Sequence, residues 1–346
     1  MTVLIAGGGS GGHVFPMVAV GDAVRAASPS AEVVYVGTAR GMEASLVPAR
    51  GDRLELLRVD PLRGGGVRGF LRGASRALAS LPAARGLVAR IRPDVMLSVG
   101  GYASGPVSLA ARLAGVPLAL LEPNSILGLA NRLLAPLVRR AYVAFPEVEK
   151  RFRPSVVMRS GVPLRGAFAA APYAPVPGRM RVLVLGGSQG AAALNERVPE
   201  AIALAARSAP ELSIVHQSGR DRDEAVRARY AELGVAERAT VTAFIDDVAA
   251  AIAGADLVVQ RSGAGAVAEI SAIGCPSLFV PYPFAADDHQ TTNARSLSDV
   301  GAAVFVPQSE ATVLRMAAEI EALARDPARR LRMAEDLLRL AEGRAR

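Results

Sequence analysis

Two glycine-rich loops, each placed between an apolar run and a helical pattern, most constrain how this chain can fold. The first loop, residues 7–12, follows the apolar residues 2–6, and the second, residues 186–191, follows residues 181–185. Glycine lets main-chain N–H groups approach a ligand closely, at the positive end of the helix that follows. We therefore expect two successive units, each of which begins with a strand, a phosphate-binding loop and a helix.

Short apolar runs alternate with helical patterns along both halves of the chain. In the first half, the runs occupy residues 3–6, 32–36, 95–98, 118–121 and 140–144. In the second half, they occupy residues 181–185, 213–216, 240–244, 257–260, 277–280 and 303–306. Helical patterns are expected at residues 17–27 and 106–114, from residue 192, and in the tail from residue 310. Apolar strands separated by helices predict an α/β fold with parallel sheets covered on both faces.

Prolines at positions 172, 175 and 177 interrupt this pattern, because proline has no N–H group to donate within a helix or a central strand. We expect a linker at residues 163–180 between an N-terminal domain of residues 1–162 and a C-terminal domain of residues 181–346. The last helix, about residues 327–346, is expected to pack back on the N-terminal domain. Ligands of such sheets bind beyond the carboxyl ends of the strands, so a cleft between the two domains is the expected site.

The composition narrows the class of protein. A net charge of +8 suits anionic partners, but the absence of tryptophan and of any recognition motif argues against nucleic acid. Cys275 is the only cysteine, which excludes an intramolecular disulfide and a multi-cysteine metal site. The sequence has neither an 18-residue uncharged apolar run nor the order of a signal peptide, so a cytoplasmic protein is expected.

Residues 61–92 contain seven arginines and no acidic residue. Phe70 and Leu71 lie between Arg68 and Arg72. One interpretation is a solvated helix surface beside a glycine-rich loop. The other is a membrane-docking patch on anionic lipid headgroups, where each nearby basic residue contributes about 1 kcal/mol.

The first loop also fits the G-x-G-x-x-G pattern of dinucleotide-binding enzymes. Such an enzyme needs an acid at the end of the second strand, whereas residues 36–40 read VGTAR and Glu32 lies at the opposite end of that strand. A nucleotide-dependent oxidoreductase is therefore disfavoured. His13 follows the loop, where its imidazole can take a proton from a sugar hydroxyl at neutral pH.

Residues 261–294 form the most informative stretch of the second half. A helix that begins near Ala264 can direct its N–H groups at a diphosphate, and Glu269 can accept from two ribose hydroxyls. His289 and Gln290 offer donors and acceptors for a sugar; their alternative role is ordinary loop polarity. Asp221 and Asp223 spell a D-x-D metal motif but begin a charged helical stretch, so we interpret them as solvated surface.

Seven motifs occur in order along nearly the whole chain: GGGSGGHVFP, SVGGYASGP, EPNSILG, LGGSQGA, FIDD, RSGAGAVAE and DDHQTTNA. The set resembles the bacterial peptidoglycan glycosyltransferases of family 28. These enzymes add N-acetylglucosamine to undecaprenyl-diphospho-muramoyl-pentapeptide, lipid I, and so make lipid II. The resemblance implies a GT-B fold, that is, two Rossmann-like domains with parallel sheets facing across a cleft. It also implies UDP-GlcNAc as donor, inversion at the anomeric carbon, no metal or other cofactor, and peripheral attachment to the cytoplasmic face of the inner membrane beside other cell-wall synthesis proteins.

The resemblance also assigns roles to residues. Ile245 would contact uracil, Glu269 the ribose, Ser188 and the helix start at Ala264 the diphosphate, and His289 and Gln290 the sugar. The remaining donor contacts would come from Ser10, Gly11, Gly12, Asn124 and Arg165. His13 is the leading candidate for the general base, and Glu122 is either a rival base or a partner that orients the site.

The chain departs from the family at a few of these positions. Ser10 replaces a frequent threonine, and Pro123 replaces the usual glutamine beside Asn124. Gly265, Ala266 and Ala268 lack hydroxyls that relatives often carry, so main-chain N–H groups must do more of the phosphate binding here. A UDP-GlcNAc 2-epimerase on the same fold remains the alternative enzyme, and a non-catalytic scaffold at the membrane remains the alternative outside enzymes.

Overall fold

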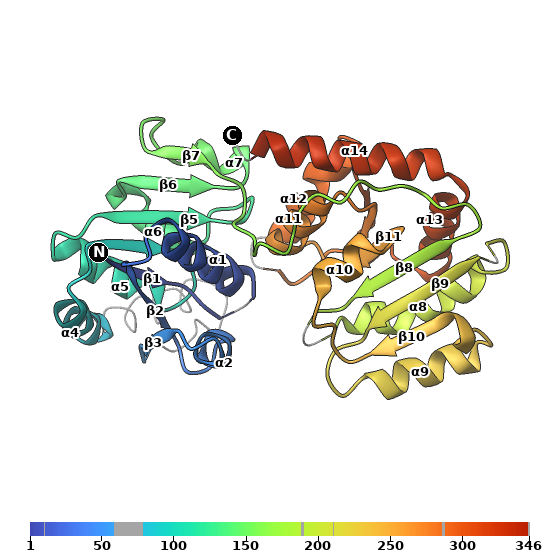
Figure 1. The fold of residues 1–346 in the computed structure, drawn as a ribbon, viewed down its shortest axis with the longest axis horizontal. Helices are drawn as coiled ribbons and strands as arrows, with labels where there is room; N and C mark the ends of the chain where they lie inside the picture. The colour runs from blue at the N-terminus through green and yellow to red at the C-terminus, as the bar shows by residue number, and fades with distance from the viewer. Residues whose placement is uncertain (10, 59–78, 188–189, 210, 286–287, 345–346) are drawn as a thin grey trace. The chain divides into compact units, whose positions relative to one another are not determined.

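The chain forms two compact units, residues Met1–Arg165 and Gly166–Gly343, each built around its own parallel sheet (Figure 1). The computed structural model describes residues 1–9, 11–58, 79–187, 190–209, 211–285 and 288–344. Each unit is an α/β unit of the kind that the alternating sequence pattern predicts.

The first sheet has the strand order β3-β2-β1-β4-β5-β6-β7, and every neighbouring pair is parallel. Its strands are β1 (Thr2–Ala6), β2 (Glu32–Gly37), β3 (Arg53–Leu56), β4 (Val95–Ser98), β5 (Leu118–Glu122), β6 (Arg140–Val143) and β7 (Val157–Arg159). Its described helices are α1 (Gly11–Ala27), α2 (Glu43–Ala49), α4 (Leu81–Ile91), α5 (Ser104–Leu113), α6 (Leu129–Leu134) and α7 (Pro146–Glu149).

Successive residues of the central strand β1 point to opposite faces of this sheet. Val3 and Ile5 join a buried cluster with Met17 of α1, whereas Leu4 and Ala6 join a second cluster with residues of α4 and α5. Both faces are therefore covered, which explains why β1 consists of consecutive apolar residues and does not alternate with polar ones.

The second sheet has the order β10-β9-β8-β11-β12-β13 and is also entirely parallel. Its strands are β8 (Met180–Leu185), β9 (Leu212–Gln217), β10 (Ala239–Thr242), β11 (Leu257–Gln260), β12 (Ser277–Phe279) and β13 (Val304–Phe305). Its helices are α8 (Ala192–Ala205), α9 (Asp223–Glu232), α10 (Val248–Ala253), α11 (Ala264–Ile273), α12 (His289–Ser298), α13 (Val313–Arg325) and α14 (Pro327–Arg344).

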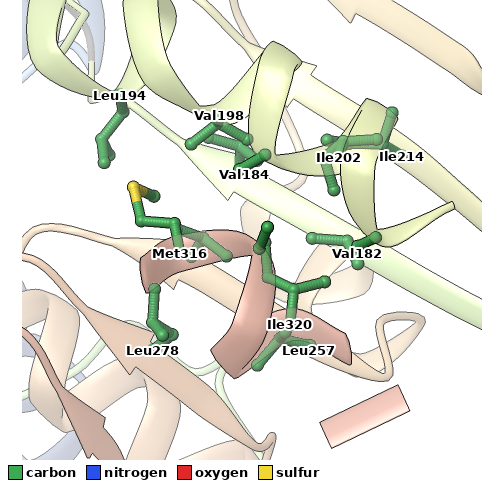
Figure 2. Packing of buried hydrophobic residues seen from close by; sticks show 14 of the residues in the cluster. Val182, Val184, Leu194, Val198, Ile202, Ile214, Leu257, Leu278, Met316 and Ile320 are labelled. Carbon is green, nitrogen blue, oxygen red and sulfur yellow. The ribbon is translucent and has the colours of Figure 1, made fainter. Parts of the chain in front are cut away.

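Helices α8 and α13 supply most of the core on one face of the second sheet. Figure 2 shows Val198 and Ile202 of α8 and Met316 and Ile320 of α13 packed over strand residues such as Val182. These side chains are 0–1% exposed, so the core fixes the position of β8.

The segment before β8 is held to the second unit by buried polar side chains. The Tyr173 hydroxyl donates to Asp256 Oδ1 (3.3 Å) and accepts from Arg330 Nε of α14 (2.7 Å). Arg330 also donates to the carbonyl oxygens of Leu323 and Ala324. Burial raises the pKa of Tyr173 to about 12, so the hydroxyl keeps the proton that it donates.

The expected strands are confirmed to within two residues at either end, but two strands were not predicted. These are β3 and β7, which lie at the two edges of the first sheet. The helical pattern expected at residues 17–27 belongs to a longer helix, because α1 begins at Gly11 and accommodates Pro16. The tail helix begins at Val313 rather than residue 310, after Thr312 caps it by accepting from Arg315 N.

Within the described residues, no helix combines the length and the apolar character needed to cross a membrane.

Helix α13 allows a direct test of the second core, because it carries one buried and one exposed leucine. Leu323 is 0% exposed and Leu314 is 74% exposed. We expect Leu323→Ala to lower the free energy of unfolding by about 2–5 kcal/mol, and Leu314→Ala to change it by less than about 0.5 kcal/mol. Urea unfolding measures both changes; equal effects would contradict the packing described.

Candidate functional site

Both sheets reverse their strand order at one point, and the glycine-rich loops lie there. In the first sheet the reversal falls between β1 and β4, and in the second between β8 and β11. Open parallel sheets bind ligands beyond the carboxyl ends of the strands at such a reversal. Residues 7–9 and 99–103 in the first unit, and residues 186–187, 190–191 and 261–263 in the second, occupy these positions.

The two loops of the first unit are in direct contact. Gly8 and Gly9 have φ values of 148° and 94°, which favour glycine. A Cβ atom at Gly101 would lie 2.5 Å from the carbonyl oxygen of Gly8. Only glycine at position 101 therefore lets the loop after β4 pack against the loop after β1.

His13 lies beside the same contact. It is the third residue of α1, after Gly11 and Gly12, and is partly buried. A Cβ atom at Gly100 would be 3.1 Å from its Nε2 atom and 3.5 Å from Asn131 Nδ2. The imidazole of His13 and the amide of Asn131 therefore both lie beside Gly100, at the carboxyl end of β4.

Glu122, the last residue of β5, is enclosed by hydrogen-bond donors. Its Oε1 accepts from the N (3.1 Å) and Nδ2 (3.2 Å) atoms of Asn124, and its Oε2 accepts from Gly128 N and Asn131 Nδ2 (3.0 Å each). The residue is 1% exposed. Burial raises the pKa of Glu122, against these hydrogen bonds, which favour the charged form. In this structure the carboxylate fixes the loop of residues 123–128.

Asn131 of α6 was not identified from the sequence, yet it is central to this network. Its Nδ2 donates to Glu122 and to the Leu121 carbonyl (3.1 Å), and its Oδ1 accepts from Ser98 Oγ (2.9 Å). It is 1% exposed. An asparagine in an amphipathic helix carries no sequence signal of such a role; the fold alone brings it to the ends of β4 and β5.

A second residue that the sequence did not reveal is Glu43, the first residue of α2. It is 0% exposed, and its carboxylate accepts from the Gly9 main chain.

The remaining expected residues of the first unit fall into two groups. Arg165 is partly buried, and its guanidinium carbon lies 4.9 Å from the ring centre of Phe15 in α1, a cation–π contact. Ser10 lies outside the described residues, as do the docking residues Arg68, Phe70, Leu71 and Arg72.

In the second unit, the starts of α11 and α12 are linked to each other. Ser262 Oγ donates to the carbonyl oxygen of Gln290 (2.8 Å), and Asn293 Nδ2 donates to the carbonyl oxygen of Ser262 (3.1 Å). Ala264 is the first residue of α11, whose first-turn N–H groups have no acceptor within the helix. Two helix starts therefore adjoin at the carboxyl end of β11.

Gln290 and His289 are the first residues of α12, not loop residues, and both are partly buried. The Oε1 atom of Gln290 accepts from Tyr282 N at 3.0 Å. Glu269 is partly buried on α11, and Ile245 is partly buried between β10 and α10. Ser188 lies outside the described residues.

Below the second glycine-rich loop lies a buried chain of neutral polar groups. Asn195 Nδ2 donates to the Ser218 carbonyl (2.9 Å), which leaves its Oδ1 to accept from His216 Nε2 (3.0 Å). The other ring nitrogen, Nδ1, then accepts from the Tyr230 hydroxyl (3.0 Å). Burial lowers the pKa of His216 to about 4, so the imidazole is neutral at physiological pH.

Gly190 lies against this chain. A Cβ atom there would be 2.0 Å from the Ser218 carbonyl oxygen, so any other residue would displace the loop. The sequence revealed the glycine but not the histidine, tyrosine and asparagine that support it.

No three His, Cys, Asp or Glu side chains of the described residues group closely enough to hold a metal ion. Asp221 is exposed before α9, and Asp223 pairs with Arg227 one turn later (3.2 Å). The D-x-D sequence thus lies on the surface of the second unit.

Comparison with known proteins finds matches in both units. Residues 3–143 match the glycosyltransferase family 28 N-terminal domain, and residues 181–344 match the family 28 C-terminal domain. A protein of Sorangium cellulosum is 64% identical over 97% of this chain and 83% of its own length. A protein of Anaeromyxobacter dehalogenans is 44% identical over 100% of this chain and 90% of its own length. Both are named UDP-N-acetylglucosamine–N-acetylmuramyl-(pentapeptide) pyrophosphoryl-undecaprenol N-acetylglucosamine transferase.

Solved structures show the same fold. The crystal structure of MurG from Acinetobacter baumannii is 31% identical, with a TM-score of 0.76 over 99% of this chain and 94% of that one. A putative UDP-N-acetylglucosamine 2-epimerase from Listeria monocytogenes has a TM-score of 0.67 over 97% of this chain and 90% of that one. At 14% identity, this second likeness concerns the fold alone.

The buried His216 predicts a specific loss of stability in acid. As the pH falls from 6.5 towards 4, the unfolded chain binds a proton that the folded chain rejects. The free energy of unfolding should therefore fall by about 1.4 kcal/mol per pH unit from this group. We expect His216→Gln to be less stable at neutral pH but to have a shallower pH dependence in this window.

Urea unfolding at intervals between pH 7.5 and 4 measures this difference. His289→Gln, the same change at a partly buried histidine, serves as the matched control. A His216→Gln variant with the wild-type slope would contradict the account.

Proposed function

The chain belongs to glycosyltransferase family 28, and we propose that it transfers N-acetylglucosamine from UDP-GlcNAc to the muramoyl 4-hydroxyl of lipid I. The product is lipid II, an intermediate of peptidoglycan and hence of cell-wall synthesis. The observation that carries the proposal is the pair of relatives named as this transferase, which match at 64% and 44% identity over nearly the whole chain.

The second unit is proposed to bind the donor. The N–H groups at the start of α11, from Ala264, receive the diphosphate, together with the glycine-rich loop that contains Ser188. Glu269 holds the ribose hydroxyls, and the main chain at Ile245 contacts uracil. Gln290 and His289, at the start of α12, bind hydroxyl groups of the sugar.

The first unit is proposed to remove the proton from the attacking hydroxyl. His13 is the general base, because its ring is only partly buried and lies at the carboxyl ends of β1 and β4. Glu122 is a positioning residue, since its two carboxylate oxygens accept four hydrogen bonds from its own loop and from Asn131. Gly11, Gly12, Ser10, Asn124 and Arg165 complete the donor contacts.

The transfer is proposed to invert the anomeric carbon in one displacement. The acceptor oxygen forms its bond to that carbon while the bond to the UDP oxygen breaks, and His13 takes the acceptor proton. Negative charge grows on the departing diphosphate, where the fixed main-chain N–H groups at the start of α11 stabilise it.

An epimerase that acts on the donor alone is not favoured. Its representative among the solved structures shares the fold at 14% identity, whereas the transferase structure from Acinetobacter baumannii shares 31%. An epimerase would convert UDP-GlcNAc without any acceptor, so acceptor dependence separates the two functions.

Because the acceptor carries a long lipid, the enzyme is proposed to dock peripherally on the cytoplasmic face of the inner membrane. The docking residues expected from the sequence, Arg68 to Arg72, lie outside the described residues. Next to that segment, helix α4 packs beside α5, and α5 beside α6. Leu113 and Leu133, on α5 and α6, are 57% and 63% exposed. Each follows an exposed arginine, Arg112 or Arg132, a composition that suits an anionic lipid surface.

We expect UDP release from UDP-GlcNAc to depend on a short-chain lipid I analogue. His13→Ala should lower kcat by about 10²–10⁴-fold and remove the acid limb of the pH–rate profile, where the wild-type base takes up a proton. Glu122→Gln should lower kcat yet keep that limb. If Glu122→Gln loses the limb and His13→Ala keeps it, the two roles are reversed. Release of UDP-ManNAc without acceptor would instead support the epimerase.

If this surface docks on the membrane, substitutions there should weaken membrane binding without changing the rate of the transfer reaction. We expect the double variant Leu113→Ser with Leu133→Ser to sediment several-fold less with phosphatidylglycerol vesicles, because two apolar contacts with the lipid are lost. Turnover of a water-soluble acceptor should be unaffected. Leu314→Ser, at a 74% exposed leucine of the second unit, is the control. Equal sedimentation of the double variant and the control would rule out this surface.

A further inference from the structure

The carboxylate of Glu43 joins the first glycine-rich loop to the end of β2. Its Oε2 accepts from Gly9 N (2.9 Å), and its Oε1 accepts from Thr38 N (2.8 Å) and Thr38 Oγ1 (3.1 Å). Glu43 is 0% exposed. A charged side chain is this deeply buried only where its acceptor atoms are matched by donors, so the contact is specific.

The surrounding main chain leaves space for this one side chain. A Cβ atom at Gly8 would lie 2.3 Å from Oε1, one at Gly41 would lie 2.1 Å from Oε2, and one at Gly37 would lie 2.3 Å from Cγ of Glu43. These glycines come from three different segments: the first loop, the end of β2, and the turn before α2. All three segments therefore converge on the carboxylate.

The first loop is held from both sides as a result. On one side, Gly9 donates to Glu43, and its carbonyl oxygen accepts from Met42 N (3.4 Å). On the other side, the Gly8 carbonyl oxygen abuts Gly101, and the neighbouring Gly100 lies against the ring of His13. A displacement of Gly8 and Gly9 would therefore disturb both the start of α1 and the loop of residues 100–101 that lies against His13.

We propose that Glu43 is a positioning residue for the transfer reaction, which fixes residues 7–9 and through them the place of His13. This inference rests on the proposed function. A run of glycines has many accessible backbone conformations, and one buried acceptor that engages Gly9 selects one of them. Misplacement of a catalytic group by about 1 Å can lower a rate by about 10²-fold.

The isosteric variant Glu43→Gln removes one hydrogen-bond acceptor while it keeps the volume of the side chain. Both oxygens of Glu43 face N–H donors, so either orientation of the glutamine amide directs its NH₂ group at a donor. We expect kcat to fall by about tenfold to a hundredfold, with little change in the KM for UDP-GlcNAc or in UDP affinity measured by calorimetry. The split between kcat and KM distinguishes positioning from a general loss of structure.

Glu55→Gln is the matched control, because Glu55 lies in the same unit on β3 and pairs only with Arg53 and Arg90 among the described residues. If Glu43→Gln retains kcat to within about twofold of this control, the proposal is wrong. It is equally wrong if kcat and UDP affinity are lost together. Should Glu43→Gln fail to fold, Thr38→Val removes only the hydroxyl contact and should lower kcat by a smaller factor; an unchanged kcat would also overturn the proposal.

Hydrogen exchange measured on the peptides that cover residues 6–15 gives a readout that needs no turnover. We expect faster exchange there in Glu43→Gln than in Glu55→Gln, since the Gly9 N–H group loses its acceptor. Equal exchange rates in the two variants would overturn the proposed role of Glu43, and this readout does not depend on enzyme activity. If the wild-type enzyme shows no acceptor-dependent release of UDP, that result counts against the proposed function. The exchange data would still decide the role of Glu43.

Discussion

Buried side chains that hydrogen-bond to loop main chain, at the carboxyl ends of the strands, are the interaction on which both units depend. In the first unit two buried carboxylates are the main acceptors, and Ser104 Oγ also donates to the carbonyl oxygen of Gly101. Glu43 accepts from Gly9 and Thr38, and Glu122 accepts from the loop that follows β5. Buried N–H groups without a strand or helix partner need such acceptors. The loops around His13 are thereby held in place by two buried carboxyl groups.

In the second unit several side chains hold the loops by donating to carbonyl oxygens, although Gln290 accepts from Tyr282 N. Asn195 donates to Ser218 and Asn293 donates to Ser262, while Arg261 donates to Val280 and Pro281. These contacts fix the loops through their carbonyl groups and do not use the N–H groups at the start of α11, which the proposed function assigns to the diphosphate. No buried carboxylate is placed against the described residues of these loops to repel a diphosphate.

The sequence predicts the parts of this design that are local. A strand, a glycine loop and a helix leave a pattern within about 25 residues, and parallel strands then place both loops of a unit at one edge. Edge strands are harder to predict from the sequence. The edge strand β3 reads RLEL, and none of its four residues is buried. Glu43 and Asn131 could not be found, since they bind Gly9 and Ser98, which lie 34 and 33 residues away, and nothing in a single sequence reports that these residues are close in space. His216 was assigned to a strand, but its partners Asn195 and Tyr230 come from two helices, α8 and α9.

The start of α11 shows why the side chains of the second unit give little indication of a phosphate-binding site. Gly263 precedes a first turn made of Ala264, Gly265 and Ala266, and none of these offers a polar side chain. Their N–H groups are nevertheless a fixed set of donors, because Val267 is the first residue whose N–H group bonds back to Gly263. Small residues keep that turn accessible to a phosphate, whereas larger ones would cover it. Under the proposed function, the stabilisation of the leaving group therefore falls to the main chain, and hence to the packing that holds α11 in place.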